Sequence, residues 1–256
     1  MDRPAIIAHR GYAGTYPENT VRAMEAASAD PRTDGLEIDV RACRDGTPVV
    51  FHDERLDRRR DGSPGLTDSS GLVRECSEET VTDAEVLGSG ETIPSLETVC
   101  ESIPAGTFVT VELKSPGDDD LRPDRDLDDE SLNRRREVWQ PFVDRVSSIL
   151  VRYDLEVRLA SFCQAAVAEA ATGSFESAPI CTYRNAEASV AFAHEHDCPA
   201  IHTDLRSIDG KSWLQDPDVD VVSAAMDTGL SIVGWTAQTW HDAIRMHEAG
   251  VDGITA

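Results

Sequence analysis

Leu36-Glu37-Ile38-Asp39-Val40 is a short, apolar and partly β-branched run, which is typical of a buried strand. It nevertheless carries two carboxylates. Side chains two positions apart on a strand point to the same side, so Glu37 and Asp39 face one direction and the apolar residues face the other. Buried carboxylates are costly without a cation, and hard oxygen ligands suit Mg²⁺, Ca²⁺ or Mn²⁺. The alternative is an edge strand whose polar side meets water.

Strand-like runs alternate with helix-like segments along the rest of the chain. Eight strands are expected, at residues 5–8, 36–40, 108–114, 157–161, 178–182, 200–203, 231–235 and 253–255. Another run, 48–51, follows an Asp-Gly turn signal and is expected to pair back as a hairpin. Helices are expected at residues 20–29, 96–102, 142–153, 164–171, 187–196, 217–227 and 239–249. This α/β alternation predicts a (β/α)8 TIM barrel, with an open doubly wound sheet as the alternative.

Two stretches interrupt the alternation. Periodicity fades between His52 and Ile93, where the chain is charged and rich in Gly, Ser and Thr. Such a length inside a compact domain indicates a functional insertion, so we expect one barrel domain over residues 1–256 that carries a small inserted subregion. A second stretch, 115–136, is dense in Asp and Arg. It is expected to be a solvated loop, or a loop that shapes the mouth of the barrel.

The charge of the chain restricts its partners. Its 256 residues carry 48 acidic and 24 basic side chains, a formal net charge of -24, and the only lysines are Lys114 and Lys211. A surface this acidic repels nucleic-acid phosphates and anionic membranes, so we expect neither nucleic acid nor stable membrane association. Acidity spread along the whole chain, with lysine depleted, indicates adaptation to high salt, where ions screen the self-repulsion.

Location and thiol chemistry follow from two absences in the sequence. No run of 18 apolar residues is present, and the N-terminal residues lack the pattern of a secretory signal, so a cytoplasmic location is expected. None of the six cysteines belongs to a C-x-x-C pair, so neither a zinc site nor a redox motif is indicated. We expect free thiols that are mostly buried.

In a parallel barrel, active-site residues gather where strands end, at the C-terminal face. The expected strand ends carry His9 and Arg10, Glu37 and Asp39, His52, and Glu112 with Lys114. Three carboxylates hold a divalent cation and leave positions open for substrate oxygens, and the two cationic side chains add an anion site. Two histidines can share the general base and general acid duties near neutral pH. The set predicts hydrolysis or transfer at a phosphodiester.

Several motifs resemble the glycerophosphodiester phosphodiesterase family. The specific ones are IIAHRGYAGTYPENT (6–20), LEIDVRACRDGTPVVFHDERLDR (36–58), IPSLETV (93–99) and VELK (111–114). Weaker ones are LASF (159–162), VGWTAQ (233–238) and GVDGIT (250–255). They cover nearly the whole chain in the family's order.

The resemblance implies a metal-dependent barrel enzyme that cleaves glycerophosphodiesters, which are small molecules, to glycerol 3-phosphate and an alcohol. It implies one divalent cation, Mg²⁺, Ca²⁺ or Mn²⁺, and it places the family's inserted subregion at about 51–91. The residues that match the family's site are the metal ligands Glu37, Asp39 and Glu112, the acid–base pair His9 and His52, the phosphate-binding Arg10 and Lys114, and the substrate-binding Trp235.

Other interpretations stay open at this point. The same barrel can act on a lysophospholipid or a phosphoinositol-type substrate, or it can bind metal and phosphate without catalysis. Trp235 suits core packing as well as substrate stacking, Phe162 is expected in the core, and Glu18 suits a turn as well as a supporting role at the site. The remaining histidines are expected to be structural or on the surface: His194, His196, His202, His241 and His247.

Overall fold

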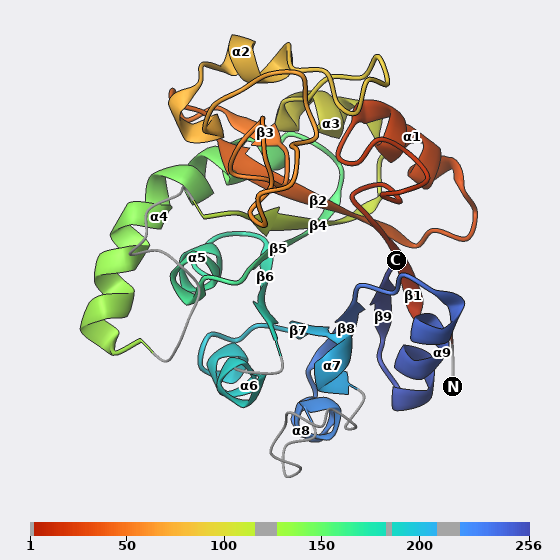
Figure 1. Cartoon of the computed structure of the whole chain (residues 1–256). Helices are drawn as coiled ribbons and strands as arrows, with labels where there is room; N and C mark the ends of the chain where they lie inside the picture. Colours follow the sequence, from red (N-terminus) through yellow and green to blue (C-terminus); the bar gives the residue numbers. More distant parts are fainter. Residues whose placement is uncertain (1–2, 116–126, 183–185, 209–220) are drawn as a thin grey trace.

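The computed structural model describes residues 3–115, 127–182, 186–208 and 221–256. Its parallel strands are β1 (Ala5–His9), β2 (Gly35–Ala42), β4 (Phe108–Leu113), β5 (Glu156–Ser161), β6 (Glu176–Cys181), β7 (Ala200–Asp204), β8 (Ser231–Trp235) and β9 (Gly253–Thr255). They are hydrogen-bonded in the order β1-β9-β8-β7-β6-β5-β4-β2, and β1 also pairs with β2. This last pairing closes the sheet, so the TIM barrel is confirmed and the open sheet is excluded (Figure 1).

Helices lie around the outside of the barrel (Figure 1). They are α1 (Val21–Ala29), α3 (Leu96–Ser102), α4 (Asp129–Leu150), α5 (Gln164–Ala170), α6 (Ala186–Glu195), α7 (Leu205–Ile208), α8 (Val221–Asp227) and α9 (Trp240–Ala249). Four of them begin after a capping residue whose side chain accepts a hydrogen bond from a first-turn backbone N–H: Thr20, Ser95, Asp128 and Thr239. Caps of this kind fix where each strand-end loop stops, and so where the site residues lie.

The expected loop at 115–136 is wrong at its C-terminal end, because α4 already begins at Asp129. Asp128 caps this helix, and Arg136 reaches Glu169 of α5 with 3.0 Å between nitrogen and oxygen. The first turns of α4 are charged, and its buried residues begin only at Trp139. The hydrophobic periodicity that indicates a helix is therefore absent from the first turns of α4. Residues 116–126 of that loop, and residues 217–220 of the expected helix 217–227, lie outside the described residues.

Strand β2 has the two-faced character that its sequence predicts. Leu36, Ile38 and Val40 are buried in the cluster that also holds side chains of α1 and α3, outside the barrel. The register pairs Glu37 with Thr110 and Asp39 with Glu112, all on the inner face. Two neighbouring strands therefore place three carboxylates inside the barrel at nearly the same height.

The segment after β2 forms a small unit of its own. Strand β3 (Pro48–Val50) runs antiparallel to β2, and the chain then folds into a 3₁₀ turn (Val73–Glu75) and helix α2 (Glu78–Thr82). The part of the unit that follows β3 lies beside β2, β3 and α3 (Figure 1). Its apolar side chains form a separate buried cluster: Cys43, Val49, Phe51, Leu56, Leu66, Val73, Val81, Ala84, Val86 and Ile93. The unit anchors the residues around His52 at the rim of the barrel.

Two further expectations concern thiols and membranes. The six cysteines all lie in described parts of the chain, none forms a disulfide, and all except the partly exposed Cys76 are buried. Within the described ranges, no helix combines the length and the apolar character needed to cross a bilayer.

We predict that salt stabilises this fold. With a net charge of -24, raising KCl from low to molar concentration screens repulsion between surface carboxylates. Relief of about 2 kcal/mol would raise the melting temperature by about 4–8 °C for a chain of this size. Thermal unfolding followed by circular dichroism measures the shift, and sucrose, which screens no charge, is the control. Equal melting temperatures in low salt and in molar KCl would contradict the prediction.

Candidate active site

The predicted site residues converge on one cavity at the C-terminal ends of the strands. The cavity has a volume of about 150 Å³, roughly ten times what a single water needs. Its wall is formed by His9, Arg10, Glu37, His52, Thr110, Glu112, Lys114, Phe162, Ile180, His202, Trp235, Thr236 and Thr255. Asp39 lies directly behind this wall, in contact with Arg10 and Lys114. The structure thus brings together all eight residues that the sequence analysis selected.

The three carboxylates form a compact cluster. Glu37, Asp39 and Glu112 each offer one oxygen, these oxygens lie within 4.8 Å of one another, and all three residues are buried. Metal–oxygen distances of about 2.0–2.6 Å place oxygens around one cation no more than about 5.2 Å apart. Both the spacing and the all-oxygen donor set therefore fit a hard divalent cation.

Asp39 is the carboxylate that the protein itself neutralises. Lys114 Nζ lies 2.9 Å from Asp39 Oδ1, and Arg10 Nε lies 3.0 Å from Asp39 Oδ2. Asn19 Nδ2 also donates a hydrogen bond to Oδ2 at 2.8 Å. Burial alone would raise the pKa of Asp39, but the adjacent Lys114 and Arg10 outweigh it and hold this pKa well below its usual range. Asp39 is therefore ionised.

Glu37 behaves in the opposite way. Its burial, together with the negative charges of Asp39 and Glu112, raises its pKa well above the usual value. Lys114 Nζ lies 2.5 Å from Glu112 Oε1, so this one ammonium group forms ion pairs with both Glu112 and Asp39 and with no oxygen of Glu37 at ion-pair distance among the described residues. If all three carboxylates were ionised, the cluster would carry more negative charge than Lys114 and Arg10 offset, and a bound cation would compensate this excess.

The loop after β1 fixes Arg10. The backbone N–H of Arg10 donates to the backbone oxygen and to Oε2 of Glu37, both at 3.0 Å. Its guanidinium donates from Nη1 to Glu18 at 2.7 Å, so Glu18 supports the site. Gly11 follows with φ +74°, and a Cβ there would lie 2.7 Å from Cβ of Ala23 on α1. Only glycine allows the loop to turn this closely over the helix.

The two histidines are held differently. His9 Nε2 lies 4.0 Å from Glu37 Oε2. Burial and the positive charge of Arg10 lower the pKa of His9 to about 4, so it is neutral near pH 7 and able to accept a proton. His52 Nδ1 lies 2.8 Å from Asp53 Oδ1. Burial opposes ionisation of Asp53, but His52 and Arg59 lower its pKa, so the carboxylate accepts the hydrogen bond and leaves Nε2 of His52 for substrate.

Aromatic side chains form the wall away from the carboxylates. The rings of Trp235, at the end of β8, and Phe162, just after β5, meet edge to face with centroids 5.6 Å apart. Both line the cavity, so the expectation that Phe162 belongs to the core is wrong. Phe162 lies two residues after Ala160, which pairs with Glu112 in the register, so the alternation of the strand places it on the inner face.

Comparison with known proteins identifies the family. The model of the glycerophosphoryl diester phosphodiesterase family matches residues 9–256. The chain belongs to this family. Glycerophosphodiester phosphodiesterases of Bacillus altitudinis and Caldanaerobacter subterraneus are 36% identical over 118 residues and 38% identical over 117 residues. Each match covers 43% of this chain and 45% of the relative, so the chain matches less than half the length of these curated relatives.

Solved structures agree on the fold of the family. An Oleispira antarctica phosphodiesterase in complex with the product sn-glycerol-3-phosphate superposes with a TM-score of 0.75 at 22% identity, over 99% of this chain and 92% of that one. The glycerophosphodiester phosphodiesterase of Thermotoga maritima gives 0.71 at 20% identity, over 100% and 95% of the two chains. At this identity the match shows the same barrel.

The sequence analysis missed several residues of the family-type site. Asn19 and Asp53 were not selected from the sequence, yet their side chains hydrogen-bond to Asp39 and His52. His202, expected to be structural or on the surface, is buried and lines the cavity, as does Thr110. The alternation along β4 and β7 marks both as inward-facing, but only the barrel register shows that they share a cavity with the carboxylates.

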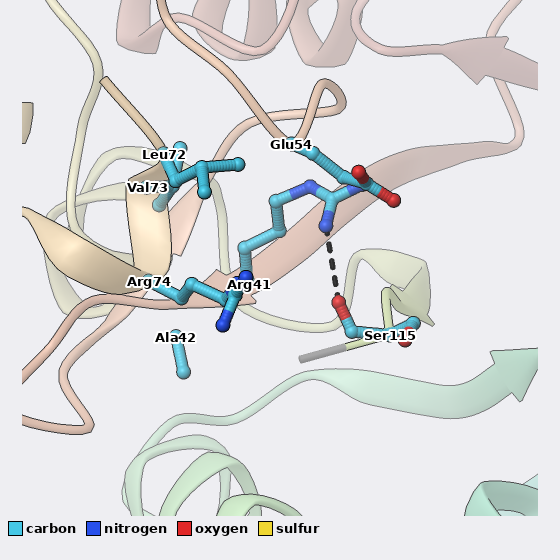
Figure 2. Close-up of a pocket in the computed structure, with 7 residues that line it drawn as sticks. All are labelled: Arg41, Ala42, Glu54, Leu72, Val73, Arg74 and Ser115. Carbon is cyan, nitrogen blue, oxygen red and sulfur yellow. Dashed lines mark hydrogen bonds between the residues drawn. The ribbon is translucent and has the colours of Figure 1, made fainter. Parts of the chain in front are cut away.

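A second, smaller pocket shows how the rim is held together (Figure 2). It is lined by Arg41, Ala42, Glu54, Leu72, Val73, Arg74 and Ser115. Arg41 donates from Nε to the backbone oxygen of His52 at 2.8 Å and from Nη1 to the backbone oxygen of Ser115 at 3.1 Å. Its burial lowers its pKa, and Glu54, whose carboxylate points toward it in Figure 2, opposes that shift. Arg41 thus ties the segment of His52 to the end of β4, next to Lys114.

We predict that Arg41→Met lowers kcat about 10- to 100-fold and changes KM less, because displacing His52 and Lys114 by about 1 Å disrupts the geometry of the reaction. Arg41→Lys should recover part of the loss. Arg74→Met is the matched control, since Arg74 lines the same pocket and its nearest partner is the exposed Glu75, 3.8 Å away. Steady-state kinetics with a glycerophosphodiester measure both constants. Equal kcat in Arg41→Met and Arg74→Met would show that Arg41 positions neither residue.

Proposed function

We propose that this chain hydrolyses glycerophosphodiesters to glycerol 3-phosphate and an alcohol, with one divalent cation, Mg²⁺, Ca²⁺ or Mn²⁺. The observation that carries the proposal is a single cavity in which a carboxylate cluster, two fixed cationic side chains and two imidazoles meet. The family match supports the reaction class, and the product bound to the Oleispira structure supports the product. Residues 1–256 act as one barrel domain, with 51–91 as its inserted subregion.

Glu37, Asp39 and Glu112 hold the cation in this proposal. Bound there, it supplies positive charge that polarises a phosphoryl oxygen and stabilises the charge that develops on it. Arg10 and Lys114 orient the phosphate beside the carboxylates. Both are fixed by buried partners, so little rearrangement is needed when substrate enters.

The histidines carry the protons. One of the two imidazoles removes the proton of the attacking hydroxyl, which is the neighbouring hydroxyl of the glycerol portion, and the other protonates the leaving alkoxide. The hydroxyl oxygen bonds to phosphorus as the bond between phosphorus and the alcohol breaks, which gives a cyclic phosphate. Water then opens this ring, with the roles of the two imidazoles exchanged. The environments described above suit this division: His9 is neutral and faces the carboxylates, whereas Asp53 orients His52 from behind.

The substrate class follows from charge and shape. A formal charge of -24 disfavours nucleic acid and anionic membranes, and the cavity of about 150 Å³ suits a small molecule held by Arg10, Lys114 and the proposed cation. The proposed location is cytoplasmic, as the sequence analysis expects. Trp235 stacks on the apolar carbons of the bound substrate, with Phe162 supporting its ring.

A metal-supplemented assay tests the proposal. Purified protein in high salt is offered glycerophosphocholine, glycerophosphoethanolamine, glycerophosphoinositol and a lysophosphatidylcholine, with Mg²⁺, Ca²⁺ or Mn²⁺, and with EDTA. We expect glycerol 3-phosphate from the glycerophosphodiesters, and its loss in EDTA. Cleavage of the lysophospholipid alone would show that the substrate is a lysophospholipid and not a glycerophosphodiester. If the folded protein cleaves none of these substrates, a barrel that binds metal and phosphate without catalysis is indicated.

A further inference from the structure

An arginine of the inserted subregion connects two segments of the site that are far apart in the sequence. Arg59 Nη2 lies 3.9 Å from Glu18 Oε2, and Arg59 Nε lies 3.9 Å from Asp53 Oδ2. The other oxygen of Glu18 lies 2.7 Å from Nη1 of Arg10. The other oxygen of Asp53 lies 2.8 Å from Nδ1 of His52. These contacts form one continuous chain from Arg10 to His52, with Arg59 at its centre.

A tight hairpin carries Arg59 to this position. Its backbone N–H donates to the backbone oxygen of Ser63 at 2.9 Å, and Gly62 donates back to the backbone oxygen of Arg59 at 3.0 Å. Gly62 has φ +85°, a conformation that glycine adopts without steric cost. Leu56 and Leu66, which flank the hairpin, are both buried in the apolar cluster of the inserted subregion. The hairpin is therefore anchored on both sides, and the fold of the inserted subregion decides where the guanidinium lies.

The two carboxylates are buried enough for Arg59 to affect them. The side chains of Glu18 and Asp53 are 12% and 11% exposed. Ion pairs between fully exposed groups contribute little, but a carboxylate removed from water needs partners for its oxygens. Asp53 Oδ2 is buried and has no hydrogen-bond partner among the described residues. Nε of Arg59, 3.9 Å away, can satisfy this oxygen after a small movement or through one bridging water.

A contact at the second oxygen fixes the plane of a carboxylate. The terminal bond of an aspartate or glutamate side chain rotates easily, so a carboxylate held at one oxygen swings about that contact. A carboxylate held at both oxygens cannot rotate without losing one of its partners. Arg59 thus fixes the carboxylate of Asp53 behind His52, and it does the same for the carboxylate of Glu18 beside Arg10.

We propose that Arg59 is a positioning residue, which couples the imidazole of His52 to the guanidinium of Arg10. The coupling runs through Asp53 and Glu18, and it holds a proton-transfer group and a phosphate-binding group at a constant spacing. The inference rests on the proposed function and adds a residue of the inserted subregion to it. The alternative is that Arg59 acts only through its charge, by attracting an anionic substrate to an acidic protein.

Two neighbouring arginines separate these alternatives. Arg59→Met removes the contacts, while Arg60→Met removes the same charge from the next residue, which is exposed and lies on the same hairpin. Misplacing a reacting group by about 1 Å costs up to about 100-fold in rate, so we expect Arg59→Met to lower kcat about 10-fold. Arg60→Met should leave kcat unchanged. Arg59→Lys should recover only part of the loss, because one ammonium group does not reproduce the fork of a guanidinium.

Two further measurements show how Arg59 acts. In the double variant Glu18→Gln/Asp53→Asn, adding Arg59→Met should lower kcat by less than about twofold, because groups that act through shared partners are not additive. Nitrogen NMR of protein with isotope-labelled histidine follows the position of the imidazole without turnover. The Nδ1 signal of His52, assigned by its loss in His52→Ala, should move in Arg59→Met and stay in place in Arg60→Met.

Several outcomes overturn the inference. An unchanged kcat in Arg59→Met, or an equal loss in Arg60→Met, would show that the contacts of Arg59 position nothing. A full Arg59→Met effect in the double variant would show that it does not act through the two carboxylates. If Arg59→Met does not fold, Arg59→Gln gives the same comparison. No turnover by the unsubstituted protein would count against the proposed function, whereas an unmoved His52 signal in Arg59→Met would count against this inference.

Discussion

Replacing His52 with alanine is expected to lower kcat by about 10²–10⁴-fold, because a positioned general acid or base contributes about this much. The side chain is 34% exposed, and its contact is the hydrogen bond to Asp53, so the fold should survive the change. Release of glycerol 3-phosphate measures the rate, and thermal unfolding confirms that the protein is folded. His9→Ala is expected to behave in the same way.

The control for this pair is His241→Ala, at an exposed position in the first turn of α9. It should leave kcat and the melting temperature unchanged. Imidazole added to His52→Ala should restore part of the rate if only the proton-transfer group was lost. A His52→Ala protein that turns over at the rate of the unsubstituted protein would refute its catalytic assignment.

Replacing Glu37 with glutamine is expected to remove tight binding of the cation and to lower kcat/KM by about 100-fold or more. A Lewis-acid cation stabilises the transition state by several kcal/mol, and each 1.36 kcal/mol changes the rate about tenfold. The effect on stability should have the opposite sign. Burial and its acidic neighbours raise the pKa of Glu37, so its ionised form costs stability above its unfolded-state pKa when no cation is bound. We therefore expect metal-depleted Glu37→Gln to melt no lower than metal-depleted unsubstituted protein at neutral pH.

Adding the cation separates the two proteins. Millimolar Mn²⁺ should raise the melting temperature of the unsubstituted protein, because a ligand that binds only the native state stabilises it by mass action, and should leave Glu37→Gln nearly unchanged. Glu79→Gln, an exposed change on α2, is the control and should respond as the unsubstituted protein does. An equal Mn²⁺-induced shift in Glu37→Gln would show that the cation binds elsewhere.

Sequence alone predicted the parts of this molecule that follow from local pattern. The alternation in Leu36–Val40 predicted a strand with acids on one face, and the helices expected at 20–29 and 96–102 are found at Val21–Ala29 and Leu96–Ser102. The seven strand-end residues were predicted to meet because parallel strands end at one face of a barrel. The structure places them in one cavity or against its wall.

What the sequence could not supply depends on register and on contacts across the barrel. His202 was expected to be structural or on the surface, and only the barrel register shows that it lines the same cavity as Thr110 and Trp235, which come from other strands. Arg41 follows Asp39 by two residues on β2, but its bonds to the backbone oxygens of His52 and Ser115 depend on where the inserted subregion and the end of β4 lie, which the sequence does not show. The first turns of α4 were hidden by their charge.

The most direct test of the account is a titration of chelator-treated protein with Mn²⁺, in which electron paramagnetic resonance measures the free ion while the rate of glycerol 3-phosphate release is followed. The account predicts one tight ion per chain, activity that appears as this ion binds, and loss of both in Glu37→Gln. Full activity before any ion is bound, or tight binding that Glu37→Gln leaves unchanged, would contradict it.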